Sequence, residues 1–112
     1  WIEADVALLA DCRDVFEATP NAETRGDLYR ASLDLKGQAL TFEYPLVARV
    51  AVSLCKLLDE ASAAIPATLI DAHVDAIRVI VRDNLKTTGD KVAMLLSAEL
   101  EARVAEFVAK GK

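Results

Sequence analysis

The helical spacing of apolar residues, divided by three prolines, constrains this chain more than any other feature. Apolar residues recur three and four positions apart along nearly the whole sequence, and this spacing lines one face of an α-helix. We find no sustained alternation of apolar and polar residues that would indicate a strand. Pro20, Pro45 and Pro66 interrupt the pattern, because proline disfavours helical geometry at the residue before it. The sequence therefore predicts an all-α fold.

We predict five helices, separated by these prolines and by the sequence TTGD. They cover about residues 2–17, 21–43, 45–63, 66–86 and 91–109. Thr19 or Asn21 is expected to cap the second helix. Outside that helix, the residues expected to be buried are Ile2, Val6, Leu9, Val15, Phe16, Val47, Val50, Leu54, Leu57, Ile70, Val74, Ile77, Ile80, Val81, Val92, Leu96, Leu100, Val104 and Phe107.

The short connections should make neighbouring helices antiparallel. We therefore expect an antiparallel up-and-down four-helix bundle with an additional N-terminal helix packed across one end. A chain of 112 residues suits one domain, so residues 1–112 should form a single unit.

Composition and charge limit the partners and the location. Hydrophobic residues make up 54% of the chain and charged residues 28%, which is typical of a folded protein. The formal net charge of −5 repels phosphate backbones and anionic lipid headgroups, so we expect no nucleic-acid or membrane partner. The most apolar segment, PLVARVAVSLCKLL, contains two charges and falls short of the roughly 20 residues of a membrane span. We find no signal-peptide pattern and expect a cytoplasmic protein in which Cys12 and Cys55 are free thiols.

The predicted helix at 21–43 carries apolar residues on two opposite faces. At about 100° per residue, the expected core stripe consists of Leu28, Ala31, Leu35, Ala39 and Phe42. The opposite face carries Leu33, Gly37 and Leu40, flanked by Tyr29, Arg30 and Lys36. Glycine inside a helix costs about 0.5–1 kcal/mol relative to alanine, and it is often kept where something approaches the backbone closely. We interpret this face as a docking surface; alternatively, the N-terminal helix covers it, or the exposed leucines have no role.

The segment LDLKGQALTF resembles the signature of histidine phosphotransfer (HPt) domains. These helical bundles exchange a phosphoryl group with the receiver domains of response regulators. The signature reads His, any residue, Leu, Lys, Gly, a small residue and, further on, an apolar residue; Leu35, Lys36, Gly37 and Phe42 match it. The order of the helices is similar to that family over nearly the whole chain, and DLKGQALTFEYPLVARVAVSLCKLLDE resembles an alphaproteobacterial branch of it.

Leu33 occupies the position that the family reserves for the phosphorylated histidine. Leucine has no lone pair with which to attack an aspartyl phosphate, so we expect this helix to carry no phosphoacceptor. Gln38 and Glu43 also depart from the family, where a small residue and a glycine are usual. The resemblance implies that Lys36 places positive charge beside a phosphoryl group or a receiver's acidic pocket.

The resemblance also implies a partner. We expect a response-regulator receiver domain to bind the face formed by Leu33, Lys36, Gly37, Leu40, Tyr29 and Arg30. A sensor kinase and a second copy of the chain are further candidates. Three origins of Leu33 stay open: a domain that binds receivers without transfer, a phosphotransfer domain whose histidine has been replaced, and a descendant that kept the fold and lost the partner.

His73 is the only histidine and hence the only possible replacement phosphoacceptor. It falls towards the core stripe of its helix, so we expect it to be buried and structural. Asp71 and Asp75 flank it, but one histidine without a nearby cysteine does not make a zinc site. No glycine-rich phosphate loop is present. We expect no metal, no cofactor and no independent enzyme; the rival interpretation is a structural or oligomerising helical bundle.

Overall fold

The computed structural model describes residues 2–61, 64–85 and 91–110. The helices are α1 (Ile2–Ala18), α2 (Ala22–Thr41), α3 (Pro45–Glu60), α4 (Ala67–Arg82) and α5 (Lys91–Lys110). This part of the chain contains no β-strand, which confirms the all-α prediction. Helices α3 and α4 end before the predicted ends at residues 63 and 86; those two residues and the TTGD sequence lie outside the described residues. None of the described helices combines the length and the apolar character needed to cross a lipid bilayer.

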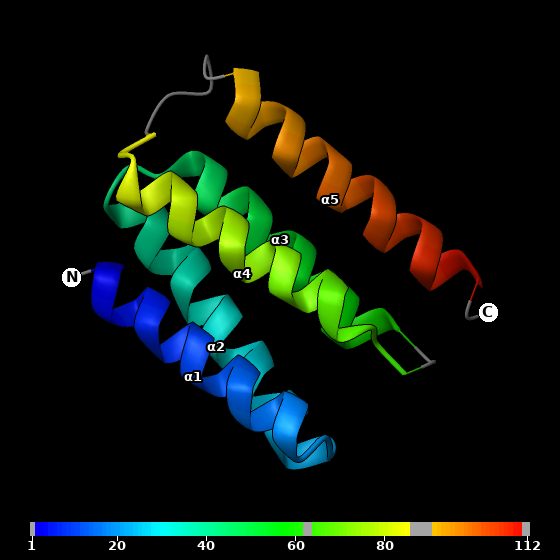
Figure 1. The fold of residues 1–112 in the computed structure, drawn as a ribbon. Coiled ribbons are helices and arrows are strands. Elements are labelled where there is room, and N and C mark those ends of the chain that lie inside the picture. Colours follow the sequence, from blue (N-terminus) through cyan, green and yellow to red (C-terminus); the bar gives the residue numbers. More distant parts are fainter. Residues whose placement is uncertain (1, 62–63, 86–90, 111–112) are drawn as a thin grey trace.

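Helices α1 to α4 form a ring in which each helix packs against the two beside it (Figure 1). Consecutive helices run in opposite directions, as predicted. Helix α5 lies outside the ring along α3 and α4, and within the described residues it has no close contact with α1 or α2. The expectation that the N-terminal helix is the additional one was therefore wrong, because α1 closes the ring between α2 and α4.

Helix α5 packs through small side chains in its first turns and through leucine and valine further along. Its buried residues are Ala93, Ser97, Leu100, Val104 and Val108. Leu100 and Val104 are buried as predicted, whereas Val92 and Leu96 were predicted to be buried and are exposed. In the first turns the buried stripe passes through Ala93 and Ser97 instead. In these turns the prediction followed the larger apolar residues, whereas the residues that are buried are small.

An ion pair joins α5 to α3. The Arg49 guanidinium of α3 donates through Nε and Nη2 to the two carboxylate oxygens of Glu101, at 2.8 and 2.7 Å. These hydrogen bonds raise the pKa of Arg49 and lower the pKa of Glu101. The two-pronged geometry favours an orientation in which the Glu101 side of α5 faces α3.

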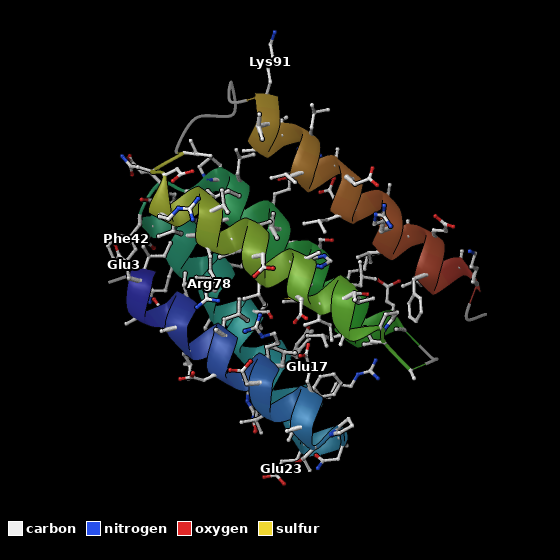
Figure 2. All side chains as sticks on the ribbon, in the orientation of Figure 1. Glu3, Glu17, Glu23, Phe42, Arg78 and Lys91 are labelled. Atoms are coloured by element: carbon white, nitrogen blue, oxygen red, sulfur yellow. The ribbon has the colours of Figure 1, made fainter. Side chains whose placement is uncertain are left out.

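The core lies inside the ring and follows the predicted stripes of α3 and α4. Its buried residues there include Val47, Val50, Leu54, Leu57, Ile70, Val74, Ile77 and Ile80, as predicted. Val15 and Phe42 were predicted to be buried and are exposed. Val15 lies outside the stripe of buried residues on α1. Phe42 follows the last residue of α2, so the helical spacing that predicted its burial no longer applies. Figure 2 shows Phe42 at the same end of the bundle as Glu3.

Helix α2 begins at a reciprocal cap and ends at a strained turn. The Asn21 side chain accepts from the Thr24 amide at 2.9 Å, and the Thr24 hydroxyl accepts from the Asn21 amide at 3.1 Å, which confirms Asn21 as the cap. At the other end, the Tyr44 amide donates to the Ala39 carbonyl at 2.7 Å. This turn places Glu43 in the left-handed region, with φ 64°, where a side chain is unfavourable.

A buried hydrogen-bonded histidine joins α3 to α4. His73 is completely buried; its Nδ1 lies 2.8 Å from the Leu69 carbonyl oxygen and its Nε2 lies 2.9 Å from the Ser53 hydroxyl. Because a carbonyl only accepts, Nδ1 carries the proton and Nε2 accepts from Ser53. Burial lowers the pKa of His73 below its ordinary value, so the ring is neutral at pH 7.

Replacing Glu43 with glycine should stabilise the fold. Glycine adopts the left-handed conformation without the steric cost of a side chain, so Glu43→Gly should raise the free energy of unfolding by about 0.5–1 kcal/mol, as measured by urea denaturation. Asn84 occupies the same position after α4, with φ 55°. Asn84→Gly should not stabilise the fold, because asparagine tolerates this conformation and its Oδ1 accepts a hydrogen bond from the Tyr44 hydroxyl at 2.8 Å. If Glu43→Gly lowered the free energy of unfolding, the contacts of the Glu43 side chain would outweigh the cost of its left-handed backbone conformation.

The stability of the bundle should fall as His73 becomes protonated. The folded-state pKa lies below the unfolded value of about 6.5, so the unfolded chain takes up the proton first as the pH falls. The stability associated with neutral His73 is therefore present above pH 6.5 and lost as the pH falls towards the folded pKa. Urea denaturation between pH 7.5 and 5.0 should show a steeper loss for the parent chain than for His73→Gln. Equal slopes would mean that His73 keeps its ordinary pKa in the fold.

Candidate functional site

The two faces of α2 are arranged as the sequence predicts. Leu28, Ala31, Leu35 and Ala39 are buried. On the opposite side, Leu33 is 41% exposed and Leu40 is 61% exposed, and Gly37 is also exposed. Helix α1 packs along α2 but leaves these residues open, so the alternative that the N-terminal helix covers them is wrong.

Neither the packing nor the backbone of this chain requires glycine at position 37. A Cβ atom added there would meet no atom within 4 Å, and the backbone is not in the left-handed region. The same holds for Gly26, which lies on the same face three turns earlier. Both glycines weaken α2 without serving the fold, so this face is open to close approach from outside.

Helix α3 forms the second wall of a groove that was not predicted from the sequence. The groove has a volume of about 380 Å³ and is lined by Tyr29, Leu33, Lys36, Val52, Cys55, Lys56, Asp59 and Glu60. Val52 is 48% exposed and lies off the buried stripe of α3. The exposure of Val52 could have been predicted from the sequence, because Val52, like Leu33, is an apolar residue outside the buried stripe of its helix.

The groove brings together only part of the predicted docking face. Tyr29, Leu33 and Lys36 line it, whereas Gly37 and Leu40 do not and continue the exposed face towards the end of α2. Arg30 is exposed and paired with Asp27 on its own helix, which occupies its guanidinium.

Arg25 fastens α2 to α3 at one end of the groove. Its Nε donates to the Leu58 carbonyl at 2.7 Å and its Nη2 donates to the Ala61 carbonyl at 2.9 Å. The last carbonyls of a helix lack partners within the helix, so Arg25 acts as a cap supplied by the neighbouring helix. The relative position of the two walls is thereby fixed.

The groove contains positive charge but no nucleophile suited to phosphoryl transfer. Within the described residues, no carboxylate forms an ion pair with Lys36 or Lys56. Cys55 is a free thiol beneath the surface, and burial raises its pKa although the Lys36 ammonium opposes the effect. The thiol is therefore protonated at neutral pH and unreactive, and Leu33 has no atom that can accept a phosphoryl group.

His73 is not available as a phosphoacceptor. It is enclosed between α3 and α4 with both ring nitrogens hydrogen-bonded, so neither can reach a phosphoryl donor. Cys12, the other free thiol, is half-buried. Among the residues that the structure describes, no three His, Cys, Asp or Glu side chains are grouped so as to hold a metal ion.

Comparisons of this chain with protein-family models, with curated protein sequences and with solved structures find no match. The functional interpretation therefore depends on the residues of the α2 face and on their placement.

Proposed function

We propose that this chain is an HPt-like helical module that binds response-regulator receiver domains without accepting a phosphoryl group. The observation that carries the proposal is the exposure of Leu33 on the outer face of α2, one turn from the open Gly37 and from Lys36, which forms no ion pair with any described residue. A receiver's acidic pocket needs a positive charge opposite it and room for close approach. Lys36 and Gly37 supply these two properties.

The available apolar surface suits a moderate affinity. Complete burial of a leucine or valine contributes about 1.5–3 kcal/mol, so three partly exposed side chains, Leu33, Leu40 and Val52, offer on the order of 2–4 kcal/mol. A dissociation constant of 1 μM corresponds to about 8 kcal/mol. Charge complementarity and contacts to the α2 backbone must therefore supply the rest.

Leu33→His tests the proposal most directly. A histidine at this exposed position, beside Lys36, should be labelled when the variant is mixed with a panel of phosphorylated receiver domains, whereas the parent chain should not. Leu40→His is the matched control, because it places an imidazole on the same face two turns further along and should remain unlabelled. If neither the parent nor Leu33→His is labelled and neither binds any receiver, the structural-bundle interpretation replaces this one.

Leu33→Asp should weaken receiver binding while leaving the bundle folded. The substitution removes apolar contact and brings a carboxylate towards an acidic partner, so the affinity should fall at least tenfold, equivalent to about 1.4 kcal/mol, by calorimetry or surface biosensing. Leu8→Asp, at a comparably exposed leucine of α1, should have no effect. Unchanged binding by Leu33→Asp would exclude the α2 face.

The same variants examine the oligomerising alternative. In that case Leu33 and Leu40 meet a second copy across a two-fold axis. Sedimentation of the parent chain would then show a stable dimer that Leu33→Asp dissociates.

A further inference from the structure

An apolar cavity lies at the end of the ring where α1 leads into α2 and α3 leads into α4 (Figure 1). It has a volume of about 510 Å³, and its apolar lining consists of three alanines together with Phe16, Pro20, Ile65 and Ile70. Ile70 is completely buried and forms the floor, whereas Phe16 and Ile65 are partly buried. Mainly apolar cavities of about 300–1,000 Å³ are typical of small-molecule sites. This cavity has that size and lining, and it shares no lining residue with the α2–α3 groove.

Arg25 places a positive charge in the cavity. A guanidinium has five N–H donors, and two of them are used on the Leu58 and Ala61 carbonyls, which leaves three N–H groups for another acceptor. Of the partly buried arginines, Arg13 and Arg49 each have a carboxylate partner. Arg25 has none among the described residues. Its charge is therefore held beside apolar surface with only neutral carbonyls as partners.

Glu17 also lines the cavity but does not neutralise Arg25. Within the described chain the two side chains form no ion pair. The Glu17 carboxyl reaches Asp71 of α4 instead, and burial together with the hydrogen bond to Asp71 raises the pKa of Glu17. Asp71 does not line the cavity. Arg25 is therefore the charged group that a ligand in the cavity can use.

We infer that this cavity binds a small monocarboxylate with an apolar body, such as a medium-chain fatty acid. The carboxylate accepts hydrogen bonds from the remaining N–H groups of Arg25, and the apolar chain lies over Ile70 against Phe16 and Ile65. Charge-assisted hydrogen bonds from a guanidinium to a carboxylate are among the strong ones in proteins. The inference goes beyond the proposed function and does not depend on it, because the site is separate from the outer face of α2.

Octanoate is the probe that tests the ligand class. The full chain is titrated with octanoate and followed by amide NMR, and saturable shifts are expected at residues 16–25 and 64–70 but not at 33–40. Octanol and octylammonium have the same chain without a negative charge, so they should bind roughly tenfold more weakly. The inference is wrong if octanoate does not saturate, if the three probes bind equally, or if the shifts centre elsewhere.

Arg25→Met separates the charge of Arg25 from its structural role. Methionine keeps a long unbranched side chain but has no charge, so the affinity for octanoate should fall roughly tenfold, to that of octanol. The affinity for octanol should stay within about twofold of the parent value, with folding checked by circular dichroism. An equal loss of both probes would mean that Arg25 only supports the shape of the cavity and does not bind the carboxylate.

Ala67→Trp tests the location without changing Arg25. Ala67 is an exposed residue at the start of α4 that lines the cavity, so a tryptophan there should fill the space and weaken octanoate binding roughly tenfold. Ala105→Trp is the matched control, because it adds the same side chain at an exposed alanine of α5 outside the cavity and should bind octanoate as the parent does. Parental binding by Ala67→Trp, or an equal loss in Ala105→Trp, would exclude this cavity as the site.

Discussion

The packing of α2 against α3 is the constraint on which the candidate site depends. Leu28 and Leu35 are completely buried, and Arg25 fastens α2 to the last carbonyls of α3. A helix that commits one face to the core must turn the residues half a turn away towards solvent. Leu33 is thus exposed because Leu28 and Leu35 on the opposite face are buried. It lies on the side of α2 next to α3 and therefore lines the groove.

The same packing supports a part of α2 that is weak in isolation. Gly37 lowers helix propensity, and Glu43 occupies an unfavourable conformation just beyond the last turn. Buried Ala39 and Tyr44 hold this end from below, and the Tyr44 hydroxyl donates to Asn84 Oδ1 at 2.8 Å. The end of α2 is therefore maintained by contacts on its inner side, so its outer side is available to a partner.

The sequence predicted the parts of the fold that large, regularly spaced apolar residues determine. The stripes of α3 and α4 and the inner face of α2 up to Ala39 were identified, because burial there involves leucine, isoleucine and valine at helical spacing. In α5 the prediction was right for Leu100 and Val104 and wrong in the first turns, because Ala93 and Ser97 contribute little apolar signal although both are buried. Phe42 was misplaced because the helix ends before it.

The candidate site was predictable only on the helix that carries the motif. Leu33, Gly37 and Leu40 were placed on the outer face from spacing alone. Val52 and Lys56 belong to the site only because α3 lies beside α2, and such proximity between helices is a property of the tertiary structure. Likewise, no spacing rule indicates that Arg25 caps a helix other than its own.

In the proposed role, leucine at position 33 changes docking as well as preventing transfer. A histidine there must give up water at its ring nitrogens when a partner covers it, and this desolvation is unfavourable unless the partner replaces those hydrogen bonds. Leucine has no polar side-chain atom to desolvate, and its burial is favourable. A receiver bound over Leu33 therefore leaves only by dissociation, with no chemical step to alter the complex. By mass action, such a domain lowers the concentration of free receiver in proportion to its own abundance and affinity.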